Sequence, residues 1–275
     1  MHTLSPTCFL FSAQVRYEEH GKGSETIVFS HGLLLSGHMY RNQVAYFSKR
    51  YRVITYDHRG QGRTEGTETG YDMDTLTDDI ALLIQSLSPD KAVIFAGLSM
   101  GGFVGMRLTA RHPDLVKKLI LMNTSCDSEP EENKPKYNQL NFFVKLFGMW
   151  SVVSKVMPIM FGKKFLEDDS RKAEQKYWAN QMKVCQKKYI TKSIEGVINR
   201  SGISDELHKI VCPTIIIAGE QDVATVPEKS RKIQSLIAGS KMIIMPGVGH
   251  MSVIEEPELT NKEIEKFIKT RNIIQ

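Results

Sequence analysis

A serine in a glycine-rich turn is the residue of this chain best suited to act as a nucleophile. Ser99 is the centre of Gly-Leu-Ser-Met-Gly at 97–101, which follows an apolar, strand-like run and opens a helix-like stretch. A sharp strand–turn–helix connection is the context in which this pattern lifts a serine hydroxyl above the edge of a sheet. Because a serine before a helix is commonly only a cap, this interpretation requires partners elsewhere in the chain. We expect the Met100 amide to donate to the oxyanion that forms when Ser99 attacks a carbonyl carbon.

A base and an acid follow two later strand-like runs. A serine at its ordinary pKa is a poor nucleophile and needs an adjacent base. His250 follows the last strand-like run of the chain, and Asp222 follows the run before it. We predict that His250 takes the Ser99 proton and that Asp222 fixes the tautomer of His250, in the chain order Ser, acid, His. The backbone N–H of Leu33, in the loop after a His-Gly pair, is the predicted second oxyanion donor.

The elements that must position these residues alternate between apolar strands and amphipathic helices. Strand-like runs occur at 26–30, 51–56, 92–96, 119–122, 214–218 and 241–245, and helix-like stretches at 40–50, 75–87, 100–110 and 258–270. Short, almost wholly apolar strands alternating with helices predict a parallel sheet that helices cover on both faces. In such a sheet the site lies outside the carboxyl ends of the strands. Each candidate residue follows a strand at that end.

The length and composition are those of an ordinary globular protein. Its 275 residues are 41% hydrophobic and 24% charged, which suits one large α/β domain with an insertion. No run of uncharged apolar residues is long enough for a membrane span, and the first residues favour a strand over a signal peptide. The scattered cysteines favour free thiols in a reducing compartment, so we expect a cytoplasmic protein. These cysteines are Cys8, Cys126, Cys185 and Cys212.

Residues 129–204 interrupt the alternation, and we interpret them as an inserted helical cap. The stretch 140–161 is apolar nearly all round, so we expect it to be buried, and we expect Pro158 to break or end a helix. A cap of this kind would roof a largely apolar pocket. The side chains expected to line that pocket are His38, Phe143, Phe147 and Trp150.

The insertion also carries the excess of positive charge. Between residues 131 and 200 there are 14 Lys and Arg against 7 Asp and Glu. A solvated basic surface is the ordinary interpretation. Attraction of an acidic substrate or an anionic surface, or a lipase-like lid that opens at a lipid surface, are the alternatives. Basic and aromatic residues do not interleave as in a nucleic-acid groove, so we expect no nucleic-acid partner. Because no apolar run is long enough to span a bilayer, we also expect no stable membrane insertion.

Five motifs in order resemble the α/β-hydrolase fold family. They are HG at 31–32, DHRGQGRT at 57–64, GLSMGG at 97–102, GEQD at 219–222 and GVGHMSVIEEPE at 247–258. The resemblance implies a mostly parallel, eight-stranded sheet with helices on both faces, built from 1–128 and 205–275, with a helical cap inserted at 129–204. Within the family the chain looks most like 3-oxoadipate enol-lactonases and related small-substrate esterases.

The resemblance implies a serine hydrolase of a small carboxylic ester or lactone that needs no metal or organic cofactor. C–C bond hydrolysis, perhydrolysis and thioester cleavage use the same triad in this family, and some members are small-molecule receptors. Some members also carry the acid after an earlier strand, where this chain has Asn123 and then Asp127.

Several other polar residues in the motifs are expected to have no chemical role. The resemblance suggests that Asp57, Arg59 and Arg63 brace their loop by charge. We expect His31 and His58 to hold loops by hydrogen bonds.

Overall fold

An eight-stranded sheet forms the centre of the structure, a computed structural model that describes residues 7–9 and 14–270. The strand order is β1-β2-β4-β3-β5-β6-β7-β8. Only β1 and β2 run antiparallel to their neighbours, and the pairs from β4 to β8 are parallel. The strands are β1 (Thr7–Phe9), β2 (Gln14–His20), β3 (Thr26–Ser30), β4 (Arg52–Tyr56), β5 (Val93–Leu98), β6 (Val116–Met122), β7 (Thr214–Gly219) and β8 (Lys241–Met245). The predicted, mostly parallel sheet is confirmed.

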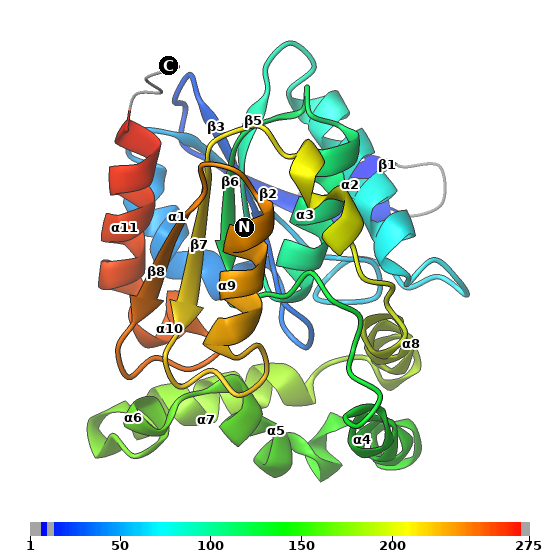
Figure 1. Cartoon of the computed structure of the whole chain (residues 1–275). Helices are drawn as coiled ribbons and strands as arrows, with labels where there is room; N and C mark the ends of the chain where they lie inside the picture. The colour runs from blue at the N-terminus through cyan, green and yellow to red at the C-terminus, as the bar shows by residue number, and fades with distance from the viewer. Residues whose placement is uncertain (1–6, 10–13, 271–275) are drawn as a thin grey trace, which may run out of the picture.

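Helices cover both faces of this sheet, and each face has its own hydrophobic core. Side chains alternate across a strand, so in β3 Ile27 and Phe29 enter one core and Val28 enters the other. Helices α1 and α11 pack in the first core, and α2, α3 and α9 pack in the second (Figure 1). The helices around the sheet are α1 (Arg41–Phe47), α2 (Met73–Leu87), α3 (Met100–Arg111), α9 (Pro227–Leu236), α10 (Ser252–Glu255) and α11 (Pro257–Lys269), with 3-10 turns η1 (Gly37–Tyr40) and η4 (Ser204–Lys209).

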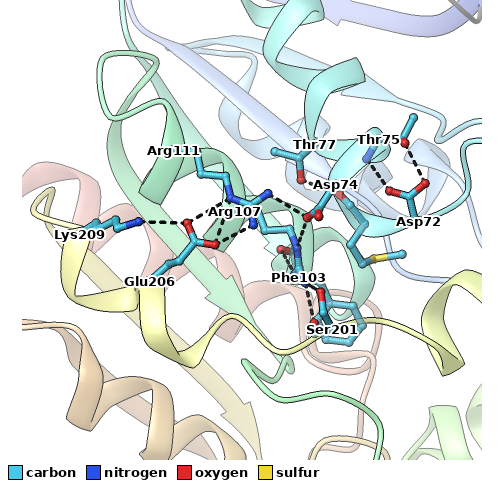
Figure 2. Close-up of polar contacts among 11 residues, drawn as sticks. Asp72, Asp74, Thr75, Thr77, Phe103, Arg107, Arg111, Ser201, Glu206 and Lys209 are labelled. Carbon is cyan, nitrogen blue, oxygen red and sulfur yellow. Dashed lines mark hydrogen bonds and ion pairs between the residues drawn. The ribbon is translucent and has the colours of Figure 1, made fainter.

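A buried arginine fixes α3, the helix that begins directly after the candidate nucleophile. Arg107 donates from Nε to Asp74 Oδ1 of α2 at 2.9 Å, and from Nη2 to the Ser201 carbonyl at 2.6 Å. It also donates to the Phe103 carbonyl one turn earlier in α3. Figure 2 shows this network, which Arg111 extends by bonding to the same Asp74 carboxylate. The helix is therefore held to α2 on one side and to the segment before η4 on the other.

A group of helices connects β6 to β7 and lies across one end of the sheet, at the bottom of Figure 1. The arrows of β7 and β8 point to this end, so it is the carboxyl end of the parallel strands. The group consists of α4 (Lys134–Phe147), α5 (Val153–Met160), α6 (Lys163–Leu166), α7 (Lys172–Lys183) and α8 (Lys187–Ile198), with 3-10 turns η2 (Met149–Ser151) and η3 (Asp169–Arg171).

The expectation of a wholly buried apolar stretch at 140–161 is wrong. Helix α4 ends at Gly148, whose φ of +87° suits glycine, and α5 begins five residues later with Pro158 inside it. The stretch is therefore two short helices instead of one long one. Phe142, Phe147 and Trp150 remain exposed to solvent.

The structure also bears on two expectations from composition, namely free cysteines and the lack of a membrane span. Cys126, Cys185 and Cys212 are free thiols, whereas the side chain of Cys8 lies outside the described part of the chain. Among the helices of the described residues, none combines the length and apolar character that crossing a bilayer requires.

Candidate active site

Ser99 lies in a strained turn between β5 and α3. Its φ is +54° and its ψ is −114°, and its side chain makes no capping hydrogen bond to the helix. A Cβ added at Gly97 would overlap the Gly101 carbonyl, and one added at Gly101 would overlap the Ser30 carbonyl. The turn therefore requires glycine on both sides of the serine. A turn that exposes the hydroxyl without using it as a cap leaves that hydroxyl available for chemistry.

The start of α3 and the loop after β3 both lie beside this serine. Met100 is the first residue of α3, so its N–H has no acceptor within the helix and lies at the positive end of the helix dipole. The loop after β3 packs against the same turn, because a Cβ added at Gly32 would lie 3.5 Å from the Ser99 Cβ. Gln61 fixes the loop by accepting from the Leu34 amide at 3.0 Å, and Leu33 and Leu34 both line the cavity that contains Ser99.

Two buried histidines hold this loop, as the sequence predicts. The His58 amide donates to His31 Nε2 at 2.8 Å, so the proton of His31 is on Nδ1, which donates to the Gly32 carbonyl at 2.7 Å. Burial lowers the pKa of both histidines and keeps them neutral. Neither side chain lines the cavity that contains Ser99.

The charged residues of the 57–64 loop are also structural. Asp57 accepts from the amides of Gly37 and Arg63, each at 2.8 Å. Arg59 forms a buried ion pair with Asp79 of α2, and the Arg63 guanidinium lies 3.5 Å from the Asp57 carboxylate. The expected bracing role of these residues is confirmed.

His250 and Asp222 meet at the carboxyl ends of β8 and β7. His250 Nδ1 lies 2.8 Å from Asp222 Oδ2, and both side chains are buried. The same carboxylate accepts from the Thr225 hydroxyl at 2.7 Å and from the Thr225 and Ala224 amides. Asn123 Nδ2 donates to it at 3.0 Å.

These contacts determine the tautomer of the histidine. An ionised carboxylate only accepts hydrogen bonds, so His250 Nδ1 carries the proton of this bond, and in the neutral imidazole Nε2 is then the nitrogen with the free lone pair. Burial works to raise the pKa of Asp222, but His250 and the hydrogen bonds from Thr225 outweigh it and hold this pKa below its ordinary 3.8. A neutral imidazole oriented in this way can act as a base.

The lowered pKa of Asp222 predicts a loss of stability in acid. The carboxylate contributes stability fully above its ordinary pKa of 3.8, and this contribution disappears as pH falls through the lowered native value. Urea unfolding at a series of acidic pH values measures this effect. In Asp222→Asn we expect a shallower fall of the unfolding free energy over the same range, and an unchanged slope would contradict the assignment.

The alternative acid lies elsewhere. Asp127 pairs with Lys232 at 2.5 Å and accepts from the Ser204 hydroxyl, at a half-buried position. Asn123, the residue after β6, instead donates to the Gly249 carbonyl and to Asp222. The structure therefore brings Asp222, and not Asp127, to His250.

Backbone strain in the described residues is concentrated at this site. Leu34, Ser99 and Asn123 are the non-glycine residues there with positive φ, at +72°, +54° and +46°. One is in the loop after β3, one in the serine turn and one beside Asp222. Strained residues of this kind occur preferentially where a protein binds or reacts.

Ser99 and His250 line one cavity, together with Leu33 and Thr225. Its empty space is about 910 Å³, counted out to the solvent at its mouth. The helices between β6 and β7 supply most of the apolar wall: Leu140, Val144, Met149, Val152, Val156, Ile159, Met160, Ile194 and Val197. A space with this lining suits a largely apolar ligand.

The prediction of which side chains line this cavity is wrong. Phe143, Phe147 and Trp150 do not line the cavity, because the face of α4 that does so carries residues at 137, 140, 141 and 144. That spacing defines one helical face and directs the aromatic residues to the opposite one. His38 borders a separate, smaller pocket and bonds to the Tyr177 hydroxyl at 2.6 Å.

Comparison with known proteins identifies the fold. The family described as alpha/beta hydrolase fold matches residues 25–151, and the family described as TAP-like protein matches residues 172–273. The enol-lactonase structure from Burkholderia xenovorans is 26% identical and superposes with a TM-score of 0.89, covering 96% of this chain and 100% of that one. This chain belongs to the α/β-hydrolase fold family.

Two further relatives of this α/β-hydrolase match it along nearly its whole length. 3-Oxoadipate enol-lactonase 2 of Acinetobacter baylyi is 26% identical over 252 residues, which is 90% of this chain and 89% of the relative. The esterase structure from Exiguobacterium antarcticum is 24% identical with a TM-score of 0.85, covering 94% and 96% of the two chains, and shows a shared fold.

The cavity of this α/β-hydrolase has a polar side that the sequence did not predict. Arg200 donates from Nη1 to Glu129 Oε2 at 2.9 Å and from Nε to the Asp127 carbonyl, and both charged side chains are buried. Its guanidinium stacks 4.3 Å from the centre of the Phe103 ring, one helical turn after Ser99. Because the pair joins positions 71 residues apart, no local pattern could have revealed it.

Breaking this pair is expected to destabilise the fold. Arg200→Met leaves the Glu129 carboxylate buried without its partner, so we expect the free energy of unfolding to fall by about 3–5 kcal/mol in urea titration. The double variant Arg200→Met/Glu129→Gln removes the uncompensated charge and should recover part of this loss. A double variant less stable than the single one would contradict the argument.

Glu255 holds the loop that carries His250. Its buried carboxylate accepts from the amides of Gly249, Met251 and Gly162 at 2.9, 3.0 and 3.0 Å. Burial raises the pKa of Glu255, although these amides oppose it. Since Gly162 lies between α5 and α6, one carboxylate joins the histidine loop to the helices above the cavity.

Substitution of Glu255 should therefore affect rate more than binding. In Glu255→Gln the amide NH2 must face an N–H donor, which displaces the histidine loop, and we expect kcat to fall about 10- to 100-fold with little change in KM. The matched control is Glu256→Gln, whose partner Lys164 lies on the surface. Equal kcat in both variants would show that Glu255 has no positioning role.

Proposed function

We propose that this α/β-hydrolase is a serine hydrolase that cleaves a small carboxylic ester or lactone. The single observation that carries the proposal is the His250–Asp222 hydrogen bond at the cavity that also contains the strained Ser99. A nucleophile, an oriented base and a buried acid are the parts that acyl transfer requires. The helices of residues 129–204 serve as a cap that limits the access of water to this site.

In the proposed mechanism His250 Nε2 takes the hydroxyl proton as Ser99 Oγ attacks the carbonyl carbon. The amides of Leu33 and Met100 hold the resulting oxyanion. The tetrahedral intermediate then expels an alkoxide, which receives the proton from His250 and leaves an acyl-enzyme. Water, deprotonated by His250, attacks the acyl carbon and releases the acid and Ser99.

The same steps open a lactone without loss of a separate alcohol. The expelled oxygen stays attached to the acyl chain, so the product is a single hydroxy acid or its keto form. The relative from Acinetobacter baylyi is named as an enol-lactonase, which supports this substrate class. The mostly apolar wall of the cavity suits a short acyl chain or a small ring.

Hydrolysis of a p-nitrophenyl ester series from acetyl to palmitoyl, followed by a panel of small lactones, tests the proposal. We expect a burst of p-nitrophenol and continued turnover on short acyl chains. The burst reports acyl-enzyme formation, and chain-length preference reports the size of the cavity. The same assays with Ser99→Ala are the control.

Other results would indicate other reactions of the same triad. Preference for long chains would contradict a small closed pocket. Acylation without turnover, or tight ligand binding with turnover far below the ordinary 10 s⁻¹ scale, would favour a receptor. Failure on all esters and lactones would direct the search to C–C bonds, peracids and thioesters.

A further inference from the structure

The outer face of α4 and the turn after it expose large apolar side chains. Phe142 is 57% exposed, Phe147 is 53% exposed and Trp150 is 67% exposed. Phe143 lies between Phe142 and Phe147, with ring centroids 5.9 Å and 6.5 Å away, so the three phenylalanine rings form one cluster. Leu146 adds a further half-exposed side chain. We call these five residues the aromatic patch.

The aromatic patch is not a face of α4 that the protein fails to bury, because the opposite face of the helix is already packed. The inner face of α4 packs on α8, where Asn141 donates to the Thr191 carbonyl at 3.2 Å, and it lines the cavity through Val144. The inner face of α4 is thus already buried against α8 and the cavity. Contiguous exposed apolar surface on a protein marks an interaction site more often than chance exposure.

The surroundings of the patch are basic. From Lys134 to Met160, which spans α4, η2 and α5, the chain contains four lysines and no Asp or Glu. Lys145 is exposed within the patch sequence, and Lys187 of α8 reaches it by donating to the Leu146 carbonyl at 3.3 Å. Neither lysine forms an ion pair with any residue that the structure describes.

We propose that the aromatic patch docks this protein on an anionic lipid bilayer. Aromatic and aliphatic side chains on one face of a short helix, with lysines beside them, are the features of a helix that lies in the membrane interface. Each lysine near an anionic surface strengthens binding about fivefold. Figure 1 places α4 and α5 along the bottom of the molecule, outside the end of the sheet, so a flat surface can approach them from that side.

The charge pattern favours lipid over a second copy of this chain. A symmetric pairing of two patches would bring Lys145 and Lys187 of both copies together with no acidic residue of α4 or α5 to neutralise them. An anionic bilayer neutralises them. This inference concerns binding and goes beyond the proposed reaction at Ser99.

Trp150 provides a direct probe. The chain has two tryptophans, and Trp178 is only 1% exposed. Adding vesicles of equal parts phosphatidylglycerol and phosphatidylcholine should shift the emission to shorter wavelength, and pure phosphatidylcholine vesicles should have a much smaller effect. Trp150→Phe should lose the shift, because the remaining tryptophan is already buried.

Vesicle co-sedimentation with matched variants completes the test. Phe143→Ser/Phe147→Ser and Lys145→Gln/Lys187→Gln should each weaken binding at least tenfold, whereas Val211→Ser, a change at an 83% exposed apolar residue outside the patch, should not. Hydrolysis of a short soluble ester by the wild type and all variants reports the cavity separately, since none of these residues lines it. Unchanged hydrolysis with lost vesicle binding supports the proposal even if the preferred substrate differs.

Three results would overturn it. They are absence of binding to anionic vesicles, equal binding to neutral and anionic vesicles, and a concentration-dependent dimer that Phe143→Ser/Phe147→Ser dissociates. The last would assign the patch to a second copy of the chain.

Discussion

Ser99→Ala is expected to reduce kcat for ester hydrolysis by about 10⁴- to 10⁶-fold. The change removes the only atom that the proposed mechanism bonds to the substrate, and the oxyanion donors and cavity alone supply the remaining rate. KM should change little, because the walls of the cavity are untouched. Steady-state kinetics and titration of the p-nitrophenol burst measure both quantities, and the burst should vanish.

The fold should survive this substitution. The Ser99 side chain makes no capping bond to α3, and the backbone of the turn is held by the glycines around it and by the Thr124 hydroxyl on the Ser99 carbonyl at 2.8 Å. Ser235→Ala, at an exposed serine of α9, is the matched control and should retain full activity. Activity of Ser99→Ala equal to that of the control would eliminate the covalent mechanism.

The positions of Ser99, Asp222 and His250 could be predicted because each follows a strand of one parallel sheet. The carboxyl ends of parallel strands meet at one edge, so residues far apart in sequence are brought together by topology alone. A strand-like run followed by a polar motif is a local pattern, and three such patterns were enough to predict this arrangement. His31 and His58 likewise follow strands β3 and β4, so their positions in loops at the same edge of the sheet could be predicted too.

The aromatic residues of α4 could not be placed in this way. Helical periodicity identifies the buried face of a helix only when the opposite face is polar. Helix α4 has apolar residues on both faces, because Val144 lies on the face at the cavity and Phe147 on the exposed face. The division at Gly148 also changes the direction of the chain before Trp150. The partners of Arg200 and Glu255 depend likewise on tertiary contacts, because each joins segments that have no relation in sequence.

Asp222→Asn is expected to lower kcat by about 10⁴-fold, through the tautomer of His250. The amides of Thr225 and Ala224 require an acceptor at the Oδ1 position, so the Asn oxygen must take that place. Its NH2 group then faces His250 Nδ1, which can only accept, and the ring proton moves to Nε2. A histidine with a proton on Nε2 cannot take one from Ser99.

The control for this prediction is Asp127→Asn, which changes the other candidate acid by the same single atom. Asp127 pairs with Lys232, and an ion pair of this exposure contributes at most about 1 kcal/mol, so stability and kcat should stay near those of the wild type. The pH dependence of kcat separates a chemical effect from a structural one. Asp222→Asn should lower kcat at every pH where the protein is folded, because the wrong tautomer persists throughout. The opposite pattern, with Asp127→Asn inactive and Asp222→Asn active, would transfer the acid to the residue after β6.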